Sequence, residues 1–464
     1  MTTGCDVVTI GAGAAGLTAA ALLALEGQRV TVLEQSPHLG GRAMAVVDEG
    51  FKLNVGGHLL EDPGSGITKI FDIVGKELIH GQVSRQMPVW DHEKETWGSV
   101  KDRYAGKKGQ LKKVIDALLK TPFEELDRWD DRCLREWLAQ HTDDAGVIDL
   151  FEFLAVLEGL TTEWWDHSAS DNLYARKMHY GERNMAGYSF WPGQGWDGMF
   201  RDLADAAVQR GASVRLGTPV ERVVIEDGAV RGVMVARQPR MVPNEIFEEE
   251  LVEADCVICT LPVWSVLRVV SEEALPDWYA GQIRHLAQDQ FRAAWLGLYL
   301  ATEDPIAIID RKELCTWLHS PELGSSGFLF EMTAMDPATA PPGVHLYVMG
   351  GCFNGRHGRD RTWLLDGFER FERDMVAMFP GFADAVWRRR HLVFDPGFGI
   401  AHKPGLVGTF RPHWRAPNIE GLYFASETFR SRGIGVDRAA RAGLTVVEEH
   451  LGRRITGLDD SWRY

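Results

Sequence analysis

The first 34 residues place a glycine-rich turn between a strand and a helix, and few folds accommodate this arrangement. A β-branched run at 5–10 predicts a buried parallel strand, and the turn after it carries Gly11, Gly13 and Gly16 in the spacing G-x-G-x-x-G. A helical segment then leads to a second strand that ends in Glu34. This order predicts a βαβ unit whose helix N-terminus receives the phosphates of a dinucleotide.

Each residue of the pattern has a physical reason. Gly11 permits the tight turn, Gly13 lets the backbone approach a pyrophosphate, and Gly16 lets the helix pack closely on the strand. A carboxylate at Glu34 can accept hydrogen bonds from ribose hydroxyls and would repel a 2′-phosphate, which disfavours NADP. A second G-x-G-x-x-G match at 193–198 lacks a following strand and acid, so we expect only a loop before a helix there.

Further blocks follow in a fixed order along the chain. Gly40-Gly41-Arg42 comes directly after the second strand, and a strand-like stretch at 51–60 follows it. Residues 220–235 alternate as a hairpin with Asp227-Gly228 as its turn. Near the C-terminus, a strand ending in Ser426-Glu427 leads through a glycine-containing turn into a final helix. In these blocks and their order the sequence resembles the FAD-dependent amine oxidase/phytoene desaturase superfamily, and the phytoene desaturase-like branch fits better.

The resemblance implies FAD, held non-covalently, as the cofactor. In the family the Gly-Gly-Arg segment meets the FAD pyrophosphate, the acid at the place of Glu427 binds the ribityl hydroxyls, and the last helix begins at the flavin pyrimidine edge. The residues assigned to FAD in this way are Gly11, Gly13, Ala14, Ala15, Gly16, Glu34, Gln35, Gly40, Gly41, Arg42, Gly56, Gly57, His58, Val220, Val223, Thr260, Ser426, Glu427, Gly435 and Val436.

The resemblance also predicts the fold class: α/β, with a Rossmann-like FAD-binding domain of the GR2 type that is interrupted by an α+β substrate domain. The FAD-binding domain is expected in 1–79, 190–264 and 391–464. The substrate domain, with a helical cap, is expected in 80–189 and 265–390. Apolar residues at helical spacing in the first of these two segments predict the cap helices.

Charge and cysteine content limit the expected partners and compartment. The chain has 50 Lys and Arg against 66 Asp and Glu, a net charge of −16, which argues against nucleic acid or an anionic membrane as partner. The six cysteines suggest no disulfide framework, and we see no secretory signal or membrane span, so we expect a cytoplasmic protein. Cys256 and Cys259 match C-x-x-C, but an offset of three in a strand puts them on opposite faces. No metal site is expected.

Three activities remain open for such a flavoprotein. The first is dehydrogenation or desaturation of a largely apolar small molecule by hydride transfer to flavin N5. The second is oxidation of an amine C–N bond, and the third is a redox-neutral isomerisation or a flavin-binding role. Amine oxidation loses ground because Arg292, Ala293 and Ala294 stand where amine oxidases of the family place a lysine. An arginine in the closing motif, Arg430 or Arg432, would also repel a protonated amine.

Two residues are candidates for catalysis. His58 follows two glycines in the block expected beside the flavin, so it is a possible acid or base, with a hydrogen-bonded structural histidine as the alternative. Arg432 is placed to anchor a substrate carboxylate or stabilise an enolate, or else to bind the flavin or a buried acid. Because no second dinucleotide site is present, the electrons are expected to pass to oxygen or a quinone, or to return to the substrate. A homodimer is one option for the assembly.

Overall fold

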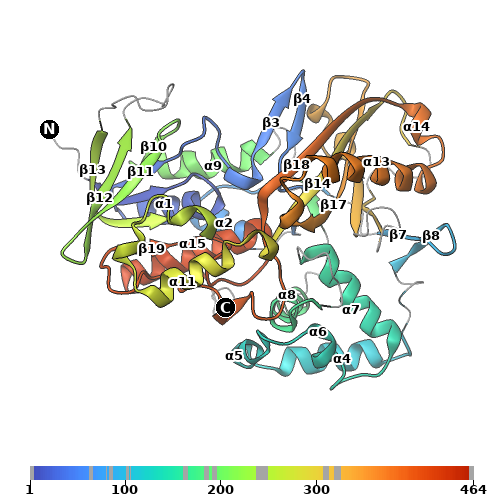
Figure 1. The fold of residues 1–464 in the computed structure, drawn as a ribbon, viewed down its shortest axis with the longest axis horizontal. Coiled ribbons are helices and arrows are strands. Elements are labelled where there is room, and N and C mark those ends of the chain that lie inside the picture. The colour runs from blue at the N-terminus through green and yellow to red at the C-terminus, as the bar shows by residue number, and fades with distance from the viewer. Residues whose placement is uncertain are drawn as a thin grey trace.

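The computed structural model describes residues 5–61, 66–79, 81–82, 87–100, 104, 106–159, 166–181, 188–190, 196–236, 249–306, 313–317 and 326–458. Within these residues the chain forms two seven-stranded sheets and a segment of helices that lies below them in Figure 1. The first sheet contains both the N-terminal strand and a strand from the C-terminal region.

The first sheet is the predicted dinucleotide-binding sheet. Its parallel strands are, in order, β10 (Ser213–Arg215), β2 (Val30–Leu33), β1 (Cys5–Ile10), β13 (Glu249–Cys259) and β19 (Leu422–Phe424). The hairpin of β11 (Val220–Glu226) and β12 (Ala229–Ala236) pairs with the first half of β13. Asp227 and Gly228 at its turn both have positive φ, 50° and 75°, which confirms the predicted two-residue turn.

Helices cover both faces of this sheet. Against one face pack α1 (Ala14–Leu25), α2 (Gly66–Val74), α9 (Trp196–Val208) and α15 (Gly435–Leu451), and against the other α10 (Val263–Val266) and α11 (Asp277–Leu286). Cys256 belongs to the first of these cores and Cys259 to the second, so the prediction that they face opposite ways is confirmed. Burial raises the pKa of both thiols to about 12, which makes neither a reactive thiolate.

The second sheet has the strand order β18 (Val386–Ile400), β14 (Arg292–Thr302), β17 (His345–Asn354), β16 (Gly327–Glu331), β15 (Cys315–Trp317), β7 (Pro88–Asp91) and β8 (Thr96–Ser99). Because side chains alternate along a strand, β14 presents two different faces. Leu296 and Leu298 share a core with Phe371 of α13 (Arg361–Met378). Trp295 and Tyr299 lie on the opposite face of the sheet.

The helical segment forms a core of its own. It consists of α4 (Gln110–Lys120), α5 (Phe123–Leu126), α6 (Leu134–Leu138), α7 (Ala145–Glu158) and α8 (Ala169–Gly181). Asp144 begins α7 as its N-cap, because its carboxylate accepts a hydrogen bond of 3.1 Å from the backbone N–H of Val147. The smaller elements are the hairpin β3 (Ala45–Asp48) and β4 (Phe51–Asn54), the three short strands β5 (Leu60–Glu61), β6 (Gly81–Gln82) and β9 (Tyr188–Phe190), and helices α12 (Met332–Met335) and α14 (Phe382–Ala385).

The predicted domain boundaries differ from the packing at two places. Residues 263–286 share a core with the first sheet, although the boundary was expected at 264/265. Strand β18 runs through the boundary expected at 390/391 and belongs to the second sheet along its whole length. We therefore propose boundaries near residues 290 and 400. The first half of the second G-x-G-x-x-G match lies outside the described residues. The helix expected after the match begins inside it, at Trp196, so the second half is helical rather than the expected loop.

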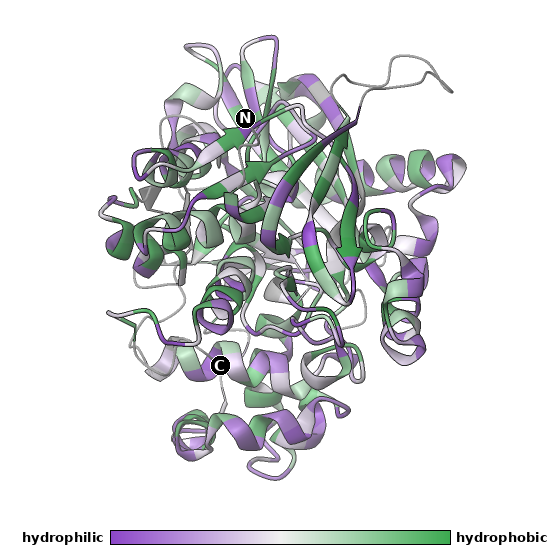
Figure 2. Cartoon of the chain, turned by 90° about the vertical axis from the view of Figure 1, so that its left-hand side faces the viewer, coloured by the Kyte–Doolittle hydropathy of each residue, from purple (hydrophilic) through white to green (hydrophobic). Residues whose placement is uncertain are grey.

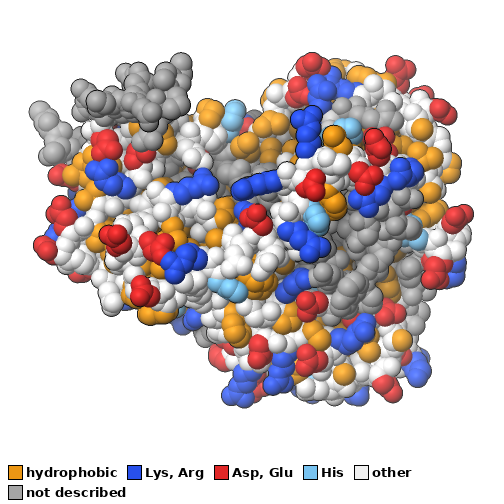
Figure 3. Space-filling view, in the orientation of Figure 1, with side chains coloured by type: hydrophobic (Ala, Val, Ile, Leu, Met, Phe, Trp, Pro, Cys, Tyr) orange, Lys and Arg blue, Asp and Glu red, His pale blue; other side chains and the backbone are white. Residues whose placement is uncertain are grey.

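The surface mixes residue types. Figure 2 shows hydrophilic and hydrophobic residues alternating along the outer helices, and no helix among the described residues is long and apolar enough to cross a membrane. Acidic and basic side chains are interspersed over the face shown in Figure 3. Neither view therefore sets one face of the molecule apart by composition alone.

Candidate functional site

The first glycine-rich turn has the close approaches that its pattern requires. Gly11 has φ of 104°, and a Cβ there would lie 2.4 Å from Oγ1 of Thr260. A Cβ on Gly16 would lie 2.0 Å from the carbonyl oxygen of Gly11. The helix that follows, α1, begins with the buried residues Ala14 and Ala15. It has no side-chain cap and no acidic residue in its first turn. Its N-terminal N–H groups and dipole are therefore available to an anion.

The substitution Gly16→Ala should remove FAD from the protein. The new methyl group would meet backbone atoms rather than a flexible side chain, so α1 must shift from β1 and the turn must open. We expect a loss of about 2 kcal/mol in the free energy of unfolding and loss of the visible flavin band from the purified protein. A suitable control is Gly27→Ala, which has positive φ but no atom within 4 Å of the new Cβ and should keep its flavin.

A second glycine segment lies directly against the first. Gly40 forms a β-bridge with Gly13, and its backbone N–H donates to the carbonyl of Ala12 at 2.9 Å. The carboxylate of Glu34 accepts hydrogen bonds of 2.8 Å from the backbone N–H groups of Ala12 and Ser36. Glu34 thus fixes the turn that carries the glycines, in addition to the ribose contact predicted for it.

The strand expected beside the adenine, β11, starts next to Glu34. The backbone N–H of Thr218 donates to the carbonyl of Glu34 at 2.8 Å, which places Val220 near the second strand. The N–H of Val223 donates to the carbonyl of Val269 at 2.7 Å, so only its carbonyl is left for a nucleotide. Gln35 is exposed beside them.

The two ends of the chain meet at an ion pair. Arg42, which follows the glycine segment, donates to Glu427 of the closing motif at 2.5 Å. The buried guanidinium of Arg411 donates to the backbone carbonyl of Glu427 and, at 2.8 Å, to that of Leu406. The predicted pyrophosphate and ribityl residues are therefore brought together across 385 positions of sequence.

The last helix begins where the resemblance placed it. α15 starts at Gly435, which has φ of 51° and open space around its Cβ position, and no side chain caps the helix. Ser426, in the place of the usual glycine, is buried and its hydroxyl lies 3.2 Å from that of Thr428. Two uncapped helix N-termini, two apposed glycine turns and the Arg42–Glu427 pair are suited to an extended diphosphate cofactor such as FAD.

His58 lies in an aromatic cluster rather than a polar one. Its ring is 5.3 Å from Trp295, 6.4 Å from Tyr299 and 5.8 Å from Phe328, measured between ring centroids. We call these four residues the His58 cluster. Neither ring nitrogen of His58 has a hydrogen-bond partner among the described residues, and burial lowers its pKa to about 3. The side chain is therefore a neutral, weak base, which does not support the predicted acid–base role.

Arg432 is held by carboxylates of the helical segment. It donates to Asp127 at 2.6 Å, to Asp130 at 2.7 Å and to Asp171 at 3.1 Å. Its guanidinium carbon also lies 4.5 Å from the ring centroid of Tyr174. Of the alternatives given above, this geometry favours the buried acid over a substrate carboxylate. We propose that Arg432 positions the closing motif against α8 instead of touching the substrate.

Other charged residues of this network were not predicted. Asp171 also accepts a hydrogen bond of 2.9 Å from Arg438 and lies 3.5 Å from His402. Asp130 accepts from Thr409 through both its N–H, at 2.7 Å, and its hydroxyl, at 2.8 Å. The signal that the sequence offers is Arg438, a charge in the final helix next to the predicted flavin residues, because a buried arginine requires an acidic partner.

Comparison with known proteins agrees with this architecture. Residues 14–451 match the family model described as flavin containing amine oxidoreductase. A phytoene dehydrogenase of Streptomyces griseus is 25% identical over 97% of this chain and 96% of its own. A putrescine oxidase of Kocuria rosea is 30% identical, but over only 30% of this chain and 32% of its own.

Solved structures show the same fold. An oxidoreductase from Methanosarcina mazei superposes with a TM-score of 0.72 at 20% identity, over 96% of this chain and 100% of its own. The glycine turns, the closing motif and the match along most of the sequence lead to one assignment. The chain belongs to the flavin-containing amine oxidoreductase family and is an FAD-dependent oxidoreductase.

Proposed function

We propose that the protein dehydrogenates or desaturates a largely apolar small molecule. The observation that supports this most directly is the His58 cluster, where the block carrying Gly56 and Gly57 meets the second sheet. Its aromatic side chains carry no formal charge, and His58 is neutral because burial depresses its pKa. His58, Trp295 and Tyr299 are buried and Phe328 is partly buried. Such an apolar environment favours hydrocarbon and disfavours an ammonium group, whose burial without a carboxylate partner is costly.

The cofactor and the protein have separate tasks. FAD, when bound, supplies the hydride acceptor, and the chain supplies binding, orientation and exclusion of water. We propose that FAD is held non-covalently by the two glycine turns, Arg42, Glu427 and the start of α15. We propose that the apolar substrate packs against the His58 cluster at Phe328, its partly buried member, which orients the substrate and keeps water from it.

Two features weigh against amine oxidation. Arg292 stands where the family's amine oxidases carry a lysine, and it is buried and paired with Asp289. In sequence, the likeness to putrescine oxidase covers less than a third of the chain, whereas the likeness to phytoene dehydrogenase covers nearly all of it. The fold does not distinguish the two activities, because a solved putrescine oxidase superposes over 98% of the chain with a TM-score of 0.65. Amine oxidation and a redox-neutral isomerisation are the two alternatives, and the following experiment distinguishes them from dehydrogenation.

Anaerobic reduction of the flavin tests this proposal. We expect the oxidised flavin band of the holoprotein to disappear when phytoene, offered in detergent micelles, is added without oxygen, and to persist with putrescine. Free FAD under the same conditions is the control. Reduction by putrescine alone would establish amine oxidation, and conversion of phytoene with the band unchanged would establish isomerisation. The rate at which air restores the band then distinguishes oxygen from a quinone as acceptor.

The compartment and assembly remain proposals of the same kind. We propose a cytoplasmic location, a small-molecule electron acceptor (oxygen or a quinone) and a homodimeric assembly. The location is supported by the six cysteines, all within the described residues, none of which is in a disulfide.

A further inference from the structure

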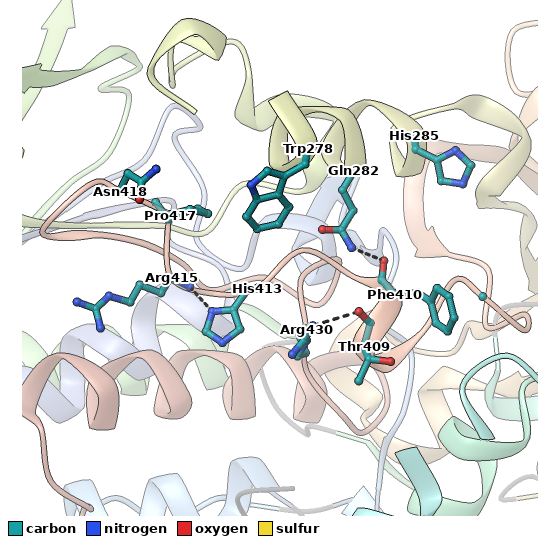
Figure 4. A pocket seen from close by; sticks show the side chains of 12 residues that line it. Trp278, Gln282, His285, Thr409, Phe410, His413, Arg415, Pro417, Asn418 and Arg430 are labelled. Atoms are coloured by element: carbon teal, nitrogen blue, oxygen red, sulfur yellow. Dashed lines mark hydrogen bonds between the residues drawn. The ribbon is translucent and has the colours of Figure 1, made fainter. Parts of the chain in front are cut away.

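A cavity of about 980 Å³ lies between α11 and residues 405–418, with Arg430 of the closing motif in its lining. Figure 4 shows Trp278 and Gln282 projecting from α11 toward His413 and Arg430 on the opposite wall. Its volume is typical of a site for a small organic ligand. Neither the flavin site nor the proposed reaction uses it.

The lining combines aromatic rings with basic groups. Trp278 is 64% exposed and Phe410 is 43% exposed, which is unusual for large aromatic side chains that face a cavity. Arg415, Arg430 and two histidines are the ionisable groups of the lining. None of the residues that line the cavity, all within the described part of the chain, is an aspartate or a glutamate. The lining is therefore positively charged, whereas the chain as a whole has a net charge of −16.

Several hydrogen-bond donors of the cavity lining are available to a ligand. Nε of Arg430 is buried and has no hydrogen-bond partner among the described residues, while its Nη2 donates to the carbonyl of Thr409 at 3.1 Å. Nδ1 of His413 accepts from the backbone N–H of Arg415 at 3.1 Å, which leaves Nε2 as a donor in the neutral ring. Arg415 also reaches Glu449 on α15, at 3.3 Å, through one of its five donors.

We infer that this cavity binds a planar aromatic anion of nucleotide size. The exposed indole of Trp278 offers a face on which an aromatic ring stacks, and the two arginines offer donors to a phosphate or carboxylate. A neutral hydrocarbon would leave the arginine donors unpaired, and a cation would be repelled. The ligand chemistry is therefore different from that of the His58 cluster.

The cavity is connected to the flavin site by a short path. Phe410 and Pro412 flank Arg411, whose guanidinium donates to the carbonyl of Glu427. The backbone N–H of Arg430 donates to the carbonyl of Pro412 at 2.9 Å. A ligand bound against this segment thus contacts residues that are hydrogen-bonded to the predicted ribityl site.

Calorimetric titration of the FAD-loaded protein with AMP tests the inference. At low ionic strength we expect AMP to bind at least tenfold more tightly than adenosine or inorganic phosphate, and added salt should weaken it. Trp278→Ala and Arg415→Met should each weaken AMP binding about tenfold, because stacking and charge-assisted hydrogen bonds are lost. Both side chains are more than half exposed, so neither change should affect folding.

Matched substitutions elsewhere serve as controls. Trp387→Ala removes another half-exposed tryptophan, and Arg222→Met removes another exposed arginine that pairs with a glutamate. Neither should change AMP affinity. The inference is overturned if AMP does not bind at millimolar concentration, if adenosine or phosphate binds as tightly as AMP, or if the control variants weaken AMP as much as the cavity variants do.

Discussion

Replacing Asp171 by asparagine should lower the free energy of unfolding by about 3–5 kcal/mol at pH 7, the range found when one partner of a buried ion pair is removed. The carboxylate is almost fully buried and receives hydrogen bonds from Arg432 and Arg438. An amide of the same shape would leave both guanidinium groups buried with less negative charge beside them. Chemical denaturation of the FAD-loaded variant measures the loss.

The pH dependence of this effect has a definite sign. Burial by itself would raise the pKa of Asp171, but Arg438, His402 and Arg432 more than offset it and hold the pKa well below its usual value. The contribution of the carboxylate is therefore fully present above the unfolded-state pKa of about 4 and is lost as pH falls below it. The gap between wild type and Asp171→Asn should narrow in that range. Asp6→Asn, which breaks an exposed pair with Arg29, is the control and should change stability little.

The parts of the fold that were predictable depend on local patterns. A β-branched run, glycines at fixed offsets and an Asp-Gly turn restrict the backbone within a few residues, and β1, α1 and the β11–β12 hairpin follow from them. The start of α15 was predictable for a different reason. It follows from a resemblance in the order of motifs, which sequence spacing alone does not supply.

The ion network was not predictable because its members share no local pattern. Asp130 and Arg432 are 302 positions apart, and nothing in the residues around either one indicates the other. The same limitation applies to the packing of residues 263–286 on the first sheet, where apolar helical spacing predicts a buried face but does not name its partner. The sequence therefore left Arg432 with a substrate group, the flavin or a buried acid as its partner, and the structure pairs it with carboxylates of the helical segment.

His58 should make the native protein sensitive to mild acid. Because burial lowers its pKa to about 3 from 6.5, the unfolded chain binds a proton at a pH where the folded chain does not. Its contribution to stability is full above pH 6.5 and falls as pH decreases toward 3. Between pH 7 and 4.5 the loss should be about 3 kcal/mol, at 1.36 kcal/mol for each pKa unit.

The variant His58→Phe isolates this effect, since phenylalanine fits an aromatic cluster and does not titrate. Its stability relative to wild type should rise by about 3 kcal/mol over the same pH interval, as measured by denaturation of the FAD-loaded proteins. His450→Phe should behave in the same direction but more weakly, because burial lowers the pKa of this only partly buried residue too. A pH-independent difference for His58→Phe would mean that the imidazole titrates in the folded protein as it does in the unfolded chain. The His58 cluster would then carry a charge in mild acid, and the proposal of an apolar substrate would lose its main support.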